Sequence, residues 1–122
     1  MERTFFGLGA LCALLGVALG AFGAHALRST LSAADLEVFE TGVRYQMYHA
    51  LGLFAVSWAS ARWPDSPVAA AGWLFVAGIL LFSGSLYVMV LSGQRWLGAV
   101  TPLGGVCFLV GWAILAWAAL RG

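Results

Sequence analysis

Two histidines, His25 and His49, are the residues of this chain best suited to chemistry. A neutral imidazole nitrogen donates well to a metal ion or to haem iron, so two helix-borne histidines that face each other could hold either. Metal sites usually have more than two donors, and no cysteine or carboxylate lies near these histidines at ligand spacing. We therefore expect hydrogen-bonding roles, with Tyr45 and Gln46 beside His49, and predict no metal and no cofactor. Haem or metal binding remains the alternative.

Four hydroxyl groups lie within two other apolar segments of the chain. Hydrogen bonds between membrane helices are worth roughly 0.6–2 kcal/mol each, so packing is the expected role, although a small polar cavity would use the same groups. No Ser-His-Asp or Cys-His arrangement with a plausible third member is present, so the sequence predicts no catalytic residue and no enzyme. The hydroxyl-bearing residues are Ser83, Ser85, Tyr87 and Thr101.

The segments that must position these groups are long and free of Asp, Glu, Lys and Arg. Each is close to the roughly 20 apolar residues that an α-helix needs to cross a bilayer. The sequence therefore predicts an all-α membrane protein with one domain, a bundle of four transmembrane helices. The expected spans are residues 5–27, 45–61, 68–91 and 96–120.

Composition supports a membrane protein, because 62% of the 122 residues are hydrophobic and 9% are charged. A soluble domain carries about 25% charged residues. The net charge of +1 argues against a nucleic-acid partner. No carboxylate or arginine falls in the middle of a span, which counts against ion-coupled transport. The expected environment is the lipid bilayer.

The polar stretch between the first two spans predicts a short amphipathic helix at the membrane surface, over residues 33–43. Ser32 and Asp35 have the spacing of a helix-capping box. Gly42 is expected to bend the chain into the second span. Glu40 and Arg44 are four residues apart, in the order that favours an ion pair.

Glycines form a stripe along the first span. Small residues let membrane helices approach closely, so dispersion and weak Cα–H···O contacts can hold them together. The stripe therefore packs the helices of one chain, or it also joins chains into a homo-oligomer. Its members are Gly9, Gly16, Gly20 and Gly23.

Four spans place both termini on the same side of the membrane. The arginine count does not fix the orientation, because the loops and ends on the two sides carry equal numbers. The free amino terminus favours a cytoplasmic location for both ends.

Several motifs resemble an uncharacterised family of bacterial inner-membrane proteins, the domain-of-unknown-function family four-two-three, which includes small eukaryotic transmembrane relatives. The resemblance covers about residues 20–112 and is specific only when the motifs are taken together. The motifs are Gly20-Ala21-Phe22-Gly23-Ala24-His25-Ala26-Leu27, Phe39-Glu40-Thr41-Gly42, Tyr45-Gln46, His49-Ala50-Leu51, Phe82-Ser83-Gly84-Ser85-Leu86-Tyr87, Thr101-Pro102-Leu103-Gly104-Gly105 and Gly111-Trp112.

This resemblance implies a four-span protein of the bacterial inner membrane and no particular enzyme class or substrate. We predict a non-enzymatic membrane protein, either a small pore or carrier or an oligomeric accessory subunit. The alternative is a haem- or metal-binding enzyme or electron carrier that uses the two histidines. We also predict that the polar residues converge near one membrane face. The predicted cluster is His25, Tyr45, Gln46, His49, Ser83, Ser85, Tyr87 and Thr101.

Overall fold

The computed structural model describes residues 1–121, and their regular secondary structure is entirely helical. Charge-free apolar stretches of spanning length form the long helices, as the sequence predicts, and two of them contain a π-helical turn. The elements in order are α1 (Glu2–Phe22), η1 (Gly23–Leu27), α2 (Ala33–Arg62), α3 (Val68–Gly78), η2 (Ile79–Ser83), α4 (Gly84–Ser92), η3 (Arg95–Ala99) and α5 (Thr101–Arg121).

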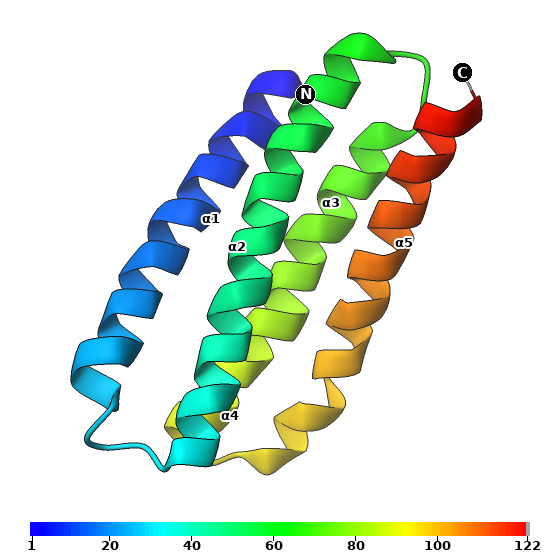
Figure 1. Ribbon diagram of the computed structural model, residues 1–122. Coiled ribbons are helices and arrows are strands. Elements are labelled where there is room, and N and C mark those ends of the chain that lie inside the picture. The colour runs from blue at the N-terminus through cyan, green and yellow to red at the C-terminus, as the bar shows by residue number, and fades with distance from the viewer. Residues whose placement is uncertain (122) are drawn as a thin grey trace.

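These elements form four rods that lie side by side, as Figure 1 shows: α1 with η1, then α2, then α3 with η2 and α4, and last η3 with α5. The rod of α2 packs against α1 and against α3, η2 and α4, while α5 packs mainly on α3 and η2. The start of α1 and the end of α5 lie at the same end of the molecule.

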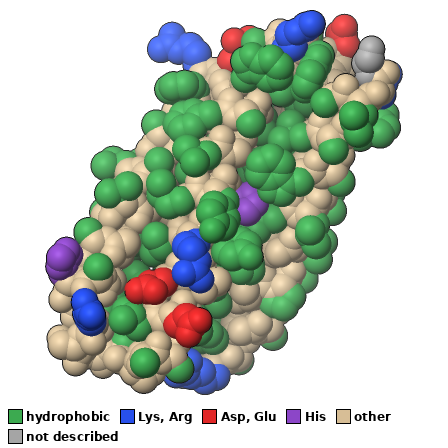
Figure 2. Space-filling view, viewed as in Figure 1, with side chains coloured by type: hydrophobic (Ala, Val, Ile, Leu, Met, Phe, Trp, Pro, Cys, Tyr) green, Lys and Arg blue, Asp and Glu red, His purple; other side chains and the backbone are tan. Residues whose placement is uncertain are grey.

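Three of the rods are long and apolar enough to cross a membrane: Glu2–Leu27, Val68–Ser92 and Arg95–Arg121. Large apolar side chains such as Leu14, Leu80 and Leu109 are exposed, and Figure 2 shows hydrophobic side chains over much of the visible face. Because such a surface is stable in hydrocarbon and not in water, the helices indicate association with a lipid bilayer.

The prediction of a separate surface helix over residues 33–43 is wrong, because these residues form the first turns of the continuous helix α2. Ser32 does cap this helix, since its Oγ accepts a hydrogen bond of 3.1 Å from the backbone N–H of Asp35. Gly42 does not bend the chain. A Cβ atom at Gly42 would lie 2.7 Å from Cε1 of Tyr87, so the glycine provides room for that ring.

The interior between the rods is filled by apolar side chains. The largest cluster joins Phe5 of α1, Leu53 and Val56 of α2, Phe75 of α3 and Phe108 of α5, all at most 4% exposed. Burial of such side chains contributes little in lipid, where close packing matters more. Within residues 1–121, the centre of the molecule is therefore a packed core.

The glycine stripe of α1 lies on α2. A Cβ atom at Gly9 would come within 2.9 Å of the carbonyl oxygen of Ala50, and one at Gly16 within 2.5 Å of the sulfur of Met47. Gly20 and Gly23 face α2 in the same way, toward Val43 and Phe39. The stripe is thus used for packing inside the chain.

Candidate functional site

His49 is a neutral side chain with both ring nitrogens hydrogen-bonded. Its Nδ1 lies 2.7 Å from the carbonyl oxygen of Tyr45, which can only accept, so Nδ1 carries the proton. Its Nε2 accepts a 3.0 Å hydrogen bond from the indole Nε1–H of Trp112. The ring also stacks on Phe108, with centroids 3.5 Å apart and planes 7° from parallel. His49 therefore joins α2 to α5.

A second hydrogen-bonded group lies where α2 meets α1 and α4. Gln46 donates from Nε2 to the backbone carbonyl of Cys12 at 2.8 Å and accepts at Oε1 from the hydroxyl of Tyr87 at 2.7 Å. Close by, Ser83 donates to the carbonyl of Gly42 at 2.6 Å. These bonds connect α1, α2 and the rod of α4. Both the oxygen and the nitrogen of the Gln46 amide have a partner.

Of the remaining predicted polar residues, Tyr45 belongs to the His49 group, and the others lie apart from both groups. Ser85 and Thr101 share a 2.6 Å hydrogen bond between α4 and α5. Tyr45 supplies its backbone carbonyl to His49, and its ring lies 4.7 Å from that of Phe82. His25, in η1, is exposed. The described residues form three hydrogen-bonded groups rather than one network, and His25 belongs to none of them; convergence of these residues near one membrane face stays a prediction.

This geometry does not suit a haem or metal held by the two histidines. Figure 2 shows them as separate patches, one at an edge of the molecule and one in the middle of the visible face. Ligation through His49 would break its bond to Trp112 or to the backbone. Within residues 1–121, no group of three or more His, Cys, Asp or Glu side chains is placed to hold a metal ion.

The histidine that bonds Trp112 forms the floor of an open groove between α2 and α5, with a volume of about 510 Å³. Pockets of ~300–1,000 Å³ with apolar walls and a few polar groups are typical of small-molecule sites. The groove is almost entirely apolar, and we call it the aromatic groove because ring side chains make up most of its lining. It is lined by Tyr45, Tyr48, His49, Phe82, Pro102, Gly105, Val106, Phe108, Leu109 and Trp112.

A second groove, of about 500 Å³, lies between α1 and α4 and is a weaker candidate. Its walls are mostly aliphatic, with Leu15 and Leu80 among them. Its two polar side chains, Gln46 and Tyr87, are bonded to each other. Both residues are therefore already engaged in hydrogen bonds within the chain.

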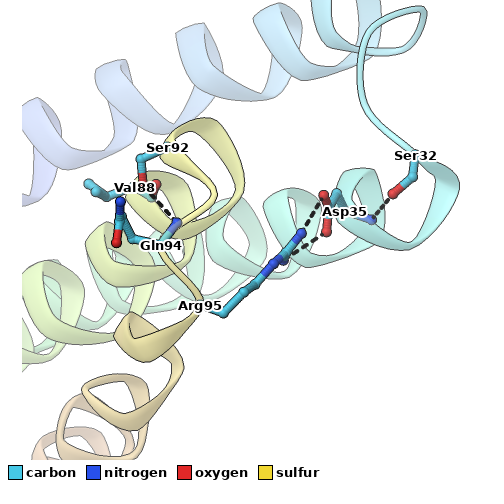
Figure 3. A network of polar contacts seen from close by, with 6 residues as sticks. All are labelled: Ser32, Asp35, Val88, Ser92, Gln94 and Arg95. Carbon is cyan, nitrogen blue, oxygen red and sulfur yellow. Dashed lines mark hydrogen bonds and ion pairs between the residues drawn. The ribbon is translucent and has the colours of Figure 1, made fainter.

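Charged residues meet at the end of the molecule where α2 begins. Figure 3 shows Arg95, at the start of η3, reaching Asp35 in the first turn of α2. The guanidinium makes two hydrogen bonds, of 3.0 and 2.9 Å, to the two carboxylate oxygens. These bonds lower the pKa of Asp35 below its ordinary value. The expected pair of Glu40 with Arg44 is replaced by a 3.1 Å hydrogen bond from Arg44 to the hydroxyl of Thr41.

Sequence reasoning missed the α5 half of the aromatic groove. Gly105, Phe108 and Trp112 follow one another at i, i+3 and i+7, the spacing of one helix face. Tyr45 and His49 are four residues apart on α2 and also share a face. These two patterns could have indicated two ring-bearing faces, although neither indicates that the faces meet.

Comparison with known proteins identifies the family of the chain. The family model described as "Protein of unknown function (DUF423)" matches residues 19–105. The chain belongs to this family. The resemblance drawn from the sequence motifs is confirmed.

Relatives in the family are called membrane proteins. The UPF0382 membrane protein YwdK of Bacillus subtilis (strain 168) is 49% identical over 120 residues, which is 98% of each chain. A UPF0382 membrane protein of Staphylococcus saprophyticus is 50% identical and covers 93% of each chain. One from Staphylococcus epidermidis (strain ATCC 35984) is 46% identical over 98% of this chain and 97% of its own length. No solved structure matches the chain.

Proposed function

We propose that this chain is a non-enzymatic, four-span protein of the bacterial inner membrane that holds a lipid-soluble molecule in its aromatic groove. It would act as a carrier of that molecule or as an accessory subunit that presents it to a partner. The observation that carries the proposal is the groove itself, which opens on the side of the molecule and has buried His49 at its floor. A lateral opening gives access from the bilayer.

The packed interior favours a lateral site over a pore. Phe5, Phe75 and Phe108 occupy the space between the rods, and each is at most 4% exposed. Conduction through one chain needs a polar or wettable path, and rings at these positions block it. The hydrogen-bonded state of His49 and Gln46 likewise favours binding and packing over proton transfer.

In addition to the three apolar rods, this proposal takes α2 as a span, although its first third is polar. A helix of this length rises about 45 Å at ~1.5 Å per residue, which exceeds the ~30 Å hydrocarbon core. The charged residues from Asp35 to Arg44 can therefore stand in the water beside one face, while residues 45–61 cross the core without a charge.

Topology mapping tests the four spans. Single cysteines placed at Thr4, Ser29, Ser66 and Ser92 in a chain without Cys12 and Cys107 would be labelled in intact and opened cells. We expect Thr4 and Ser66 to react only from the cytoplasm and the other two only from outside. Labelling of Thr4 and Ser66 from opposite sides would contradict four spans.

Blocking the groove tests the ligand. A Cβ atom at Gly105 would meet nothing within 4 Å, so Gly105→Leu should fill the groove without disturbing the fold. Gly7 on α1 is equally open and lies outside the groove, so Gly7→Leu is the matched control. Native mass spectrometry of protein isolated from membranes should find a lipophilic compound on wild type and Gly7→Leu. Equal amounts on Gly105→Leu would contradict the proposal.

A further inference from the structure

We propose that the aromatic groove is selective for a molecule with a rigid, planar ring system and one polar substituent, over flexible acyl chains. This inference rests on the proposed function and adds the chemical class of the ligand. It follows from three features of the lining: the exposed rings, the gap beside Gly105 of α5, and the phenolic hydroxyls of Tyr45 and Tyr48.

The rings of the lining hold one another in fixed orientations. His49 and Phe108 are stacked, and the Tyr45 ring is 17° from the plane of His49 and 23° from that of Phe108. Their centroids lie 6.3 and 6.4 Å from that of Tyr45. His49 and Phe108 are each 4% exposed, so the ring surface left for a ligand belongs to Tyr45, Tyr48 and Trp112, which are 38%, 54% and 43% exposed. A planar ring can lie in offset stacking or edge-to-face contact on these rings, whereas an acyl chain gains no comparable orientation-dependent contact.

The wall contributed by α5 has a gap where a ligand could lie. Gly105 has no side chain, and the space beside it is open. The ring of Pro102 continues the same side of the groove. A rigid ring loses less conformational freedom on such a wall than a chain with many rotatable bonds, so more of its contact energy remains as affinity.

The polar groups of the lining that can still select a ligand are two tyrosine hydroxyls. The ring nitrogens of His49 and the indole N–H of Trp112 are already used by each other and by the backbone. Tyr45 and Tyr48 are 38% and 54% exposed, and within residues 1–121 their hydroxyls make no hydrogen bond. A phenolic hydroxyl both donates and accepts, so it suits a hydroxyl or carbonyl substituent on the ligand ring.

A pair of probes with the same number of carbon atoms and one hydroxyl each tests ring selectivity: 2-naphthol, which is planar and rigid, and 1-decanol, whose saturated chain is flexible. The full chain is placed in nanodiscs of dimyristoyl phosphatidylcholine, and binding is titrated by native mass spectrometry. Wild type, Gly105→Leu and Gly7→Leu are compared at equal bilayer concentrations of probe. The Gly7→Leu variant controls for partition of each probe into the lipid.

We expect 2-naphthol to bind wild type and Gly7→Leu alike, at least about ten-fold more tightly than the saturated probe. Gly105→Leu should lose this binding. If both probes bind equally and Gly105→Leu abolishes both, the ring selectivity is wrong while the groove remains a ligand site. If neither probe binds in a way that Gly105→Leu affects, this inference is overturned; the compound found on the protein from membranes then decides separately whether the groove holds any ligand.

Discussion

Two adjoining parts of the α2 surface, one toward α1 and one toward α5, each carry a buried polar residue, yet they are built differently. On the α1 side, Gln46 lies beside a seam of glycines, where Gly9 lets the two backbones come close and Gly16 leaves room for the side chain of Met47. On the α5 side, His49 lies beside rings, and its bond to Trp112 is the only side-chain hydrogen bond found between α2 and α5 within residues 1–121. One side is closed by small residues, and the other is held apart by large ones.

This difference separates stability from binding. A seam of glycines gives many short contacts along the whole length of two helices, which is how membrane helices associate without a hydrophobic driving force. A seam of rings cannot close completely, because the rings keep the helices apart and leave the aromatic groove. We therefore expect substitutions on the α1 side to change folding and substitutions in the groove to change ligand binding.

The largest effect is expected where a side chain is forced into the glycine seam. Gly9→Leu would place a branched side chain against the backbone oxygen of Ala50 and should lower the free energy of unfolding by about 3 kcal/mol or more. Gly7→Leu, two residues away in open space, should have little effect. Unfolding by dodecyl sulfate in mixed micelles measures both. Similar values for the two variants would remove the basis of the comparison.

Removing His49 should lower the free energy of unfolding less than Gly9→Leu does, because only the contacts between α2 and α5 are lost and those between α1 and α2 stay intact. His49→Ala leaves a cavity beside Phe108 and an unpaired Trp112 N–H, and should lower the unfolding free energy by about 2–3 kcal/mol. Leu80→Ala, at a side chain that is 68% exposed, is the control and should have a much smaller effect. Equal melting of the two variants in detergent would mean that the His49 contacts do not stabilise the fold.

The Gln46 group sharpens the comparison further. Gln46→Leu leaves the Tyr87 hydroxyl without its acceptor and should cost about 1–2 kcal/mol. Adding Tyr87→Phe removes that hydroxyl, so the double variant should be more stable than the sum of the two single variants. A double-mutant cycle in the same unfolding assay gives this coupling energy. Strict additivity would show that the Gln46–Tyr87 bond contributes nothing.

The smallest effect is expected outside the bilayer. Because the bonds from Arg95 lower the pKa of Asp35, this pair stabilises the folded state above the ordinary carboxyl pKa of ~3.9 and is lost as the pH falls through the lower folded value. Asp35→Asn should reduce stability slightly at neutral pH, and the difference from wild type should vanish in acid. A difference that stays constant down to about pH 2 would argue against the ion pair.

Much of the fold follows from local patterns in the sequence. Apolar stretches between charges give the long helices, and Ser32 gives the start of α2. The surface helix was wrong because Gly42 was taken as a bend. Its actual role, room for the ring of Tyr87, depends on a contact between residues far apart in the chain. Local propensity cannot reveal such a contact.

Only part of the candidate site could be predicted from the sequence, because the rest depends on contacts between residues far apart in the chain. His49 and Tyr45 were identified by residue type, since imidazole and phenol in an apolar segment need partners. Trp112 was missed as the partner, because nothing in the local sequence shows which helix its indole N–H faces. The separation of the polar residues into three groups depends on which helix each part of the α2 surface meets, and residues as close as Gln46 and His49 contact different helices.

The hydrogen bonding of His49 is the central claim, because it makes the imidazole a neutral floor of the groove rather than a ligand or a charge. Solid-state ¹⁵N–¹H NMR of histidine-labelled protein in bilayers measures it directly, with His25→Gln to assign the remaining signals. We predict a proton on Nδ1, none on Nε2, and a change at Nε2 alone in Trp112→Phe. A doubly protonated ring, or a proton on Nε2 that is indifferent to Trp112→Phe, would contradict the account.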